Sequence, residues 1–262
     1  RSLGPSERNQ FSVYLDLPAG YDITATKESA ETLMRYLLNK SYNPEVTDVV
    51  GYVGTGGPRF FLALSPNDPQ PNKAFFVVNT ASYQQVDTVM KRAQQYIVEG
   101  LPLATGRAEL LFLGTAPLGT VEYRISGPEI GTLRQLGQQV SNAFYEIDSI
   151  QAVRNDWENP VLKIRVEIDQ DRARHSGVTS EVIARTLSGY YDGEAVTVFR
   201  EREKNIPIIM RAQPNMRDTI DGLRTVEVPS SNGTFIPLMQ FADLSGSIEP
   251  SKIVRHNQER TL

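Results

Sequence analysis

The order in which apolar periodicities follow one another constrains the fold of this chain more than any other feature. Residues 11–17 alternate apolar with polar side chains, which predicts a half-buried strand, and residues 30–38 carry an apolar stripe of helical period. The same two periods recur, predicting strands over 46–53, 75–80 and 108–113 and a helix over 86–97. The order strand, helix, strand, strand, helix, strand is the ferredoxin-like split βαβ motif, so we expect an α+β fold.

The pattern starts again after this unit. Strands are expected over 121–126 and 149–154, on either side of a helical stripe over 130–147, and together they make one βαβ half of a second unit. The matching second half does not follow directly. From about Leu162 an unlike pattern intervenes, which we interpret as a smaller α+β module inserted into the second unit.

The inserted module carries its own local signals. Alternation over 162–168 predicts a strand, Asp169 and Asp171 suit the capping of a short helical turn, and Thr179 is a suitable N-cap for a helix over 181–187. Two hairpins are expected next, the second across an Asn-Gly turn signal. Their strands lie at 196–199 with 206–211 and at 226–228 with 235–238.

Composition excludes several classes of function. A chain of 262 residues suits about two domains, and 27 Lys and Arg against 31 Asp and Glu leave no basic stripe of the kind that binds nucleic acid. No cysteine is present, so disulfides and thiolate metal sites are excluded. The longest apolar runs, such as 75–78 and 110–113, are far shorter than the ~20 residues of a membrane span. With no signal peptide and no initiator Met, the chain is expected to be an excised piece of a larger protein.

A cluster of glycines, Gly51, Gly54, Gly56 and Gly57, follows the second predicted strand. A phosphate cradle would lead into a helix and would carry a Lys-Ser/Thr pair, whereas Pro58 and an extended segment come next here. The two interpretations that remain are a plain turn and a mobile loop.

No motif in the sequence indicates catalysis, a resident metal or a cofactor. The Gly-x-Ser-x-Gly elbow is absent, and His175 and His256 have no partner at metal-ligand spacing. We therefore expect no enzyme activity. The single tryptophan, Trp157, is interpreted either as a core plug or as a face on which a ligand stacks, and the mixed-charge run 200–204 as a solvated hairpin tip.

Several stretches together resemble the second large periplasmic loop of resistance-nodulation-division (RND) efflux transporters. They are residues 5–11 with 17–20, 51–60, 163–170 with Ala173, 177–179, and 253–257. The resemblance implies two ferredoxin-like porter subdomains, with a docking subdomain inserted into the second. The expected parts are the first porter subdomain at 1–117, the first half of the second at 118–160 and the docking subdomain at 161–252, the return half being absent or only begun at 253–262.

The resemblance also implies which residues form a substrate site. Tyr14, Val50, Tyr52, Leu110 and Phe112 match positions that line a drug pocket, and Arg154 matches an arginine at the entrance between the porter subdomains. Gly54, Thr55, Gly56 and Gly57 match a flexible switch loop between two pockets, with a static turn as the alternative. Because strands alternate faces, only one parity of each strand can face such a pocket.

The function implied is that of a proton-driven inner-membrane exporter of amphipathic or hydrophobic compounds. This chain would be its periplasmic portion in a Gram-negative bacterium. The implied partners are two further copies in a homotrimer, a periplasmic adaptor protein, an outer-membrane channel and small hydrophobic substrates, but no nucleic acid. The alternative is a non-transporting periplasmic binding or assembly scaffold, and a remote third is an anion- or nucleotide-binding domain.

Overall fold

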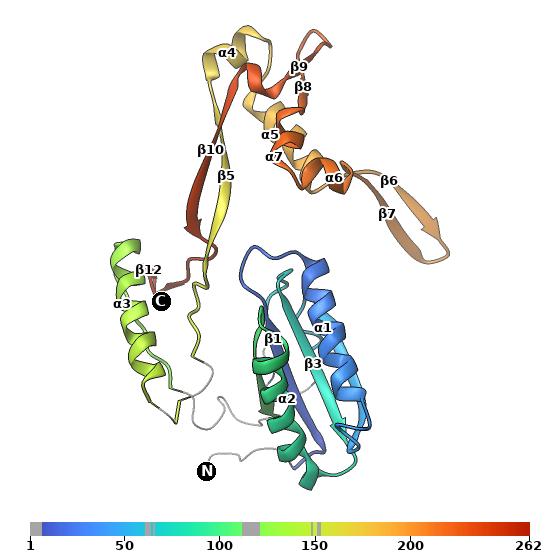
Figure 1. The fold of residues 1–262 in the computed structure, drawn as a ribbon. Helices are drawn as coiled ribbons and strands as arrows, with labels where there is room; N and C mark the ends of the chain where they lie inside the picture. The colour runs from blue at the N-terminus through green and yellow to red at the C-terminus, as the bar shows by residue number, and fades with distance from the viewer. Residues whose placement is uncertain (1–6, 61–63, 65, 112–120, 148, 151–152) are drawn as a thin grey trace. The chain divides into compact units, whose positions relative to one another are not determined.

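The computed structural model describes residues 7–60, 64, 66–111, 121–147, 149–150 and 153–262 (Figure 1). The chain divides into two compact units. The first comprises Arg1–Leu162 with Ile248–Leu262, and the second comprises Lys163–Ser247. Each unit is described by itself below.

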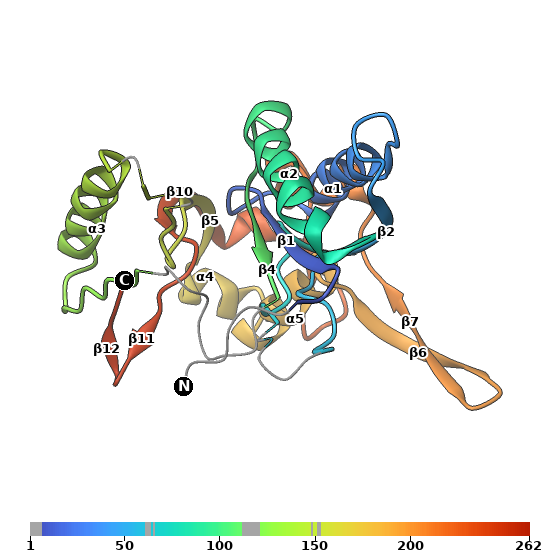
Figure 2. The same cartoon turned by 90° about the horizontal axis from the view of Figure 1, so that it is seen from below.

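The first unit is built on a four-stranded antiparallel sheet of order β2-β3-β1-β4. Its strands are β1 (Gln10–Asp16), β2 (Val46–Val53), β3 (Lys73–Thr80) and β4 (Thr105–Leu110). Helices α1 (Ile23–Leu38) and α2 (Val86–Gly100), the latter preceded by the short η1 (Tyr83–Gln85), cover one face of the sheet (Figure 2). This element order confirms the βαββαβ prediction.

Strand β1 shows why the sheet has a helix side and an outer side. Phe11, Val13 and Leu15 are fully buried in the core that the helices form with the sheet. The intervening Tyr14 is also buried, but it belongs to a separate small cluster with Phe75. The sequence predicted a half-buried strand, and this is wrong for β1, because both of its faces are covered.

Helix α3 (Ile130–Tyr145) confirms the helical stripe predicted for the remainder of the first unit. The predicted strand over 121–126 is reduced to a bridge between Ser126 and Thr261, with Ile125 and Leu262 exchanging backbone hydrogen bonds of 2.9 Å. In the predicted strand over 149–154, residues 151 and 152 lie outside the described residues, and none of the others is in a strand.

The indole of Trp157 ties the first unit to its C-terminal segment. Trp157 is 1% exposed, and its Nε1 donates to the carbonyl oxygen of Thr261 at 2.6 Å. The core-plug interpretation of this residue is therefore correct, and its ring is not a free stacking face. A small hairpin of β11 (Arg255–His256) and β12 (Glu259–Arg260) precedes Thr261.

The second unit contains the predicted strand, helices and hairpins. Strand β5 (Pro160–Ile168) pairs with β10 (Ala242–Pro250). Asp169 caps α4 (Gln170–His175) by accepting from the amides of Asp171 and Arg172, and Thr179 caps α5 (Ser180–Tyr191) by accepting from the amide of Val182. The remaining elements are β6 (Glu194–Glu201), β7 (Lys204–Met210), α6 (Pro214–Arg217), α7 (Ile220–Arg224), β8 (Glu227–Pro229), β9 (Phe235–Pro237) and η2 (Leu238–Gln240).

The β6–β7 hairpin differs from the rest of the second unit because all of its residues are exposed. It extends away from the helices of its own unit in Figure 1. The core of the unit gathers around Val228, Leu238 and Phe241 and does not include the hairpin. The exposed apolar side chains of the hairpin are Val196, Val198, Phe199, Ile206, Ile208, Ile209 and Met210.

Candidate functional site

The outer face of the first sheet, opposite the helices, carries a row of aromatic side chains. Tyr14 lies opposite Phe75 in the β1–β3 register, and Phe75 lies opposite Tyr52 in the β3–β2 register. The ring centroids are 5.0 Å apart for Tyr14 and Phe75 and 6.3 Å apart for Tyr52 and Phe75. Val50 and Val77 form the next pair on the same face. We call this row the outer aromatic face.

The segment between β2 and β3 folds back onto the outer aromatic face. Leu64 is 5% exposed and packs in one cluster with Tyr14 and Phe75, and the Phe60 ring lies 6.5 Å from that of Phe75. Two hydrogen bonds close the base of this loop. The Gly54 amide donates to Lys73 O at 2.7 Å, and the Gln70 amide donates to Gly54 O at 3.1 Å.

Glycine is required by the geometry of this loop. Gly54 and Gly57 have φ angles of +75° and +71°, in the region that residues with a Cβ rarely adopt. A Cβ on Gly56 would lie 2.3 Å from the backbone nitrogen of Asn67, and one on Gly57 would lie 2.9 Å from the Tyr52 ring. The conformation is that of a packed turn, and no helix begins among the described residues between this turn and β3.

The structure brings together part of the predicted site. Tyr14, Val50 and Tyr52 share the outer aromatic face, whereas Leu110 lies opposite Phe11 in the register and packs against the helix-side core. The sequence analysis placed Leu110 in the same pocket as Tyr14, and this is wrong, because the two side chains lie on opposite faces of the sheet. Phe112 lies outside the described residues.

Arg107 on β4 lies on the outer aromatic face, although the sequence analysis assigned only Leu110 and Phe112 of this segment to the pocket. It lies opposite Tyr14 in the register, and its guanidinium carbon is 3.9 Å from the centre of the Tyr14 ring, a cation–π contact. Its guanidinium also forms an ion pair with Glu109. The sequence analysis missed Arg107, because only the pairing register of β4 shows which parity faces outward.

Further charged groups border the outer face at one end. Lys73 forms an ion pair of 2.6 Å with Glu158, both side chains being 19% exposed. Asp16 follows Tyr14 by two residues, and its Oδ1 is buried and receives no hydrogen bond from any residue that the structure describes. Burial raises the pKa of the Asp16 carboxyl, against the opposing effects of Lys73 and Arg107. Burial likewise raises the pKa of Tyr14.

Arg154, the predicted entrance residue, lies near enough to act electrostatically on this end of the sheet. Its positive charge favours the ionised forms of both Tyr14 and Asp16 and so lowers the pKa of each, although burial outweighs it in both cases.

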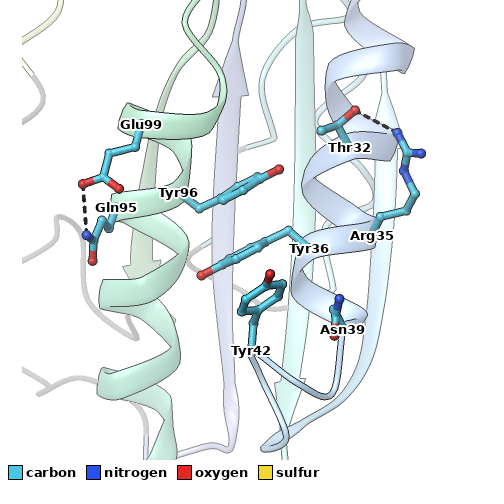
Figure 3. Close-up of a pocket in the computed structure, with 8 residues that line it drawn as sticks. All are labelled: Thr32, Arg35, Tyr36, Asn39, Tyr42, Gln95, Tyr96 and Glu99. Carbon is cyan, nitrogen blue, oxygen red and sulfur yellow. Dashed lines mark hydrogen bonds between the residues drawn. The ribbon is translucent and has the colours of Figure 1, made fainter.

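A second surface feature, which the sequence analysis did not identify, lies between α1 and α2 on the helix side. Figure 3 shows the rings of Tyr36 and Tyr96 lying parallel, with the Tyr42 ring beside Tyr36. The ring centroids of Tyr36 and Tyr96 are 3.7 Å apart, and the angle between the ring planes is 4°. The Arg92 guanidinium forms a bidentate ion pair with Glu45 and also donates to Tyr42 O. Burial raises the pKa of Tyr36. These contacts join the two helices.

Two further properties concern only the described part of the chain. Among the described residues, none of the helices combines the length and the apolar composition that a membrane span requires. No three His, Cys, Asp or Glu residues there are grouped so that they could hold a metal ion.

Comparisons with known proteins identify relatives across the whole chain. A family model described as AcrB/AcrD/AcrF family matches residues 3–262. The cobalt-zinc-cadmium resistance protein CzcA of Cupriavidus metallidurans is 24% identical over 147 residues, which cover 54% of this chain and 14% of that protein. The cation efflux system protein CzcA of an Alcaligenes species gives the same values.

Solved structures share the fold. Two crystal forms of a heavy metal efflux pump superpose with TM-scores of 0.78 and 0.77, at 18% and 16% identity. They cover 99% and 100% of this chain, but only 27% and 28% of the pump chain is matched. The chain therefore spans about a quarter of the length of these structural relatives.

Proposed function

Because this chain belongs to the AcrB/AcrD/AcrF family of RND efflux transporters, we propose that it forms part of the periplasmic region of a proton-driven inner-membrane exporter in a Gram-negative bacterium. The exporter binds amphipathic or hydrophobic compounds on the outer aromatic face and passes them outward. The observation that carries this proposal is the row of Tyr14, Phe75 and Tyr52, bordered by Arg107. Apolar walls with a few polar anchors suit loosely selective binding.

We propose the following division of labour along the chain. Residues 1–117 form the first porter subdomain, residues 118–160 the first half of the second, and residues 161–252 a docking subdomain, with the return half absent or only begun at 253–262. The four-stranded sheet, the separate compactness of Lys163–Ser247 and the hydrogen bonds between Ile125 and Leu262 support this division.

The glycine segment is proposed as the switch of the porter subdomain. Gly54, Thr55, Gly56 and Gly57 begin a loop whose Leu64 covers Tyr14 and Phe75, so moving the loop would uncover the outer aromatic face. Two backbone hydrogen bonds, those of the Gly54 amide to Lys73 O and of the Gln70 amide to Gly54 O, close the base of the loop. A loop that stays in its packed turn during transport is the alternative.

The proposed assembly is a homotrimer with a periplasmic adaptor protein and an outer-membrane channel. Family membership supports it, and so does the exposed β6–β7 hairpin, because seven large apolar side chains on one hairpin indicate a surface that a partner covers.

A metal cation is the second candidate substrate. The relatives named above carry names that refer to cobalt, zinc, cadmium, cations or heavy metals, and they are the observation that favours it. The aromatic character of the outer face favours organic substrates instead.

Export by the full-length pump tests the proposal. The parent gene should be expressed in a Gram-negative strain that lacks its own RND pumps, and the efflux of a neutral hydrophobic dye should be followed alongside tolerance to zinc, cobalt and cadmium. Tyr52→Ala should reduce dye efflux several-fold, because it removes one ring from the row. Tyr83→Ala, at an exposed tyrosine on η1, is the matched control.

Each outcome has a defined meaning. Metal tolerance without dye efflux would assign the pump to metal cations, and neither activity in the intact pump would favour the non-transporting scaffold. Equal efflux by Tyr52→Ala and by the control would contradict the outer aromatic face as the substrate site.

A further inference from the structure

The chain leaves the first unit through a short segment, residues 157–159, that bonds to several distant parts of that unit. We call this segment the clasp. The Trp157 carbonyl oxygen accepts from Ser251 Oγ at 3.0 Å, directly after β10 ends, and its indole bonds to Thr261. Strand β5 begins at the next residue, Pro160. The clasp therefore joins the start of β5 to the end of β10 within the first unit.

The side-chain amide of Asn159 pairs with the loop between β1 and α1. Its Oδ1 accepts from the Ala19 amide at 2.7 Å, and its Nδ2 donates to the Ala19 carbonyl oxygen at 3.2 Å. Two residues on neighbouring antiparallel strands exchange the same two bonds. The next residue of the loop, Gly20, has its Cβ position only 3.4 Å from a methyl carbon of Val161. The clasp is thus held to the end of β1 by both polar and apolar contacts.

Glu158 joins the clasp to β3. Its carboxylate pairs with the Lys73 ammonium at 2.6 Å, and because both side chains are 19% exposed, water screens this pair less than it screens a surface pair. The φ of Glu158 is +57°, which residues with a Cβ rarely adopt. Such a conformation persists only where the surrounding contacts hold it, and it is common in switch regions.

Lys73 connects the clasp to the loop between β2 and β3 through its own backbone. Its carbonyl oxygen accepts from the Gly54 amide at 2.7 Å, and its amide donates to Gln70 O at 3.2 Å. One residue therefore bonds to the base of the loop through its backbone and to Glu158 through its side chain. A displacement of Lys73 changes both contacts.

We propose that the clasp is a mechanical coupler, which passes movement of the loop between β2 and β3 through Lys73 and Glu158 to the start of β5. The inference rests on the proposed function, because it links the loop over the substrate face to the strands that lead into the docking subdomain. Each step is a direct bond, from Gly54 to Lys73, from Lys73 to Glu158, and along the backbone to Pro160. Energetic coupling between distant sites is carried by contiguous groups of this kind.

Hydrogen exchange in the purified full-length pump tests the link. Glu158→Gln keeps the shape of the side chain and removes its charge, so exchange should rise several-fold in peptides that contain Gly54, which Lys73 holds. Asn159→Ala removes the two bonds to Ala19 and should raise exchange at Ala19 and at Gly54 alike. Glu31→Gln makes the same substitution in an exposed ion pair of α1 and should leave both amides as in the wild type.

Dye efflux and dye binding separate coupling from substrate recognition. With a neutral hydrophobic dye, Glu158→Gln should lower efflux by the full-length pump several-fold, because the loop no longer moves together with the start of β5. Binding of the same dye to the purified pump should remain as in the wild type. A loss of binding that accounts for the loss of efflux would place Glu158 in substrate recognition and overturn the proposal.

The remaining outcomes are also decisive. Unchanged exchange at Gly54 in Glu158→Gln and Asn159→Ala, or an equal rise in Glu31→Gln, would overturn the coupling. Loss of protection throughout the four-stranded sheet in both clasp variants would show that the clasp is required for folding, and would overturn it as well. A wild-type pump that exports no dye would contradict the proposed function instead, while the exchange measurements would still decide whether the loop and the clasp are linked.

Discussion

Gly57 lies against the Tyr52 ring, where a Cβ would stand only 2.9 Å from Cδ2 of the tyrosine. The φ of Gly57 is +71°, so glycine is favoured there by both backbone conformation and space. The contact connects the glycine segment directly to the outer aromatic face.

Replacing Gly57 by alanine should therefore loosen the loop. We expect Gly57→Ala to lower the free energy of unfolding of the first unit by about 1–2 kcal/mol through backbone strain and the clash with Tyr52. Hydrogen exchange at the amides of Gly54 and Gln70, which close the loop, should become faster. Gly131→Ala, at a glycine of α3 with no atom within 4 Å of its Cβ position, should leave this exchange unchanged. Unaltered protection in Gly57→Ala would contradict the packed turn.

The stability contributed by Asp16 should depend on pH with a defined sign. Because burial raises its pKa in the folded state, the folded chain binds more protons than the unfolded chain above pH ~3.9, the usual aspartate pKa. Stability is therefore lost at this site as pH rises through the folded pKa. Asp16→Asn should be more stable than the wild type at pH 7, by about 1 kcal/mol, and this advantage should disappear toward pH 4.

Urea unfolding measured between pH 4 and pH 7.5 checks this prediction. Trp157, the only tryptophan, lies in the first unit, so its fluorescence reports the relevant transition. Asp48→Asn, at an exposed aspartate of β2, should show no comparable pH trend. A gain in Asp16→Asn that is constant across the range would argue against a raised pKa.

The indole hydrogen bond of Trp157 should contribute measurably to the first unit. Trp157→Phe removes the donor to Thr261 O and leaves a void where the larger ring stood. We expect a loss of about 2–4 kcal/mol in thermal unfolding followed by circular dichroism, combining the unpaired carbonyl with the cavity. Tyr145→Phe, at a tyrosine that is 68% exposed, should cost less than about 0.5 kcal/mol.

The stacked rings of Tyr36 and Tyr96 should be coupled energetically. A double-mutant cycle with Tyr36→Ala and Tyr96→Ala should give an interaction energy of about 0.5–1.5 kcal/mol, the range for aromatic pairs. The same cycle between Tyr36→Ala and Tyr14→Phe pairs residues on opposite sides of the sheet and should give a value near zero. Equal values in the two cycles would mean that the stack adds nothing beyond burial.

Local signals in the sequence predicted the βαββαβ order of the four-stranded sheet with its two helices, and the helix caps of the second unit. The alternation of Phe11, Val13 and Leu15 assigned these residues to one face, and the structure buries all three under the helices. Asp169 and Thr179 were recognised as caps, because an oxygen-bearing side chain before a helical stripe bonds the free amides of the first turn. These features depend on residues close together in the chain.

Tertiary structure alone decided which side chains share the outer face and what covers them. The sequence analysis grouped Leu110 with Tyr14, but the β1–β4 register places Arg107 opposite Tyr14 and turns Leu110 toward the helices. Likewise, alternation could not reveal that Leu64 covers Tyr14, which lies fifty positions away in the chain. Register and long-range docking are set by which distant surfaces fit together, and side-chain periodicity within one segment carries no information about its partner.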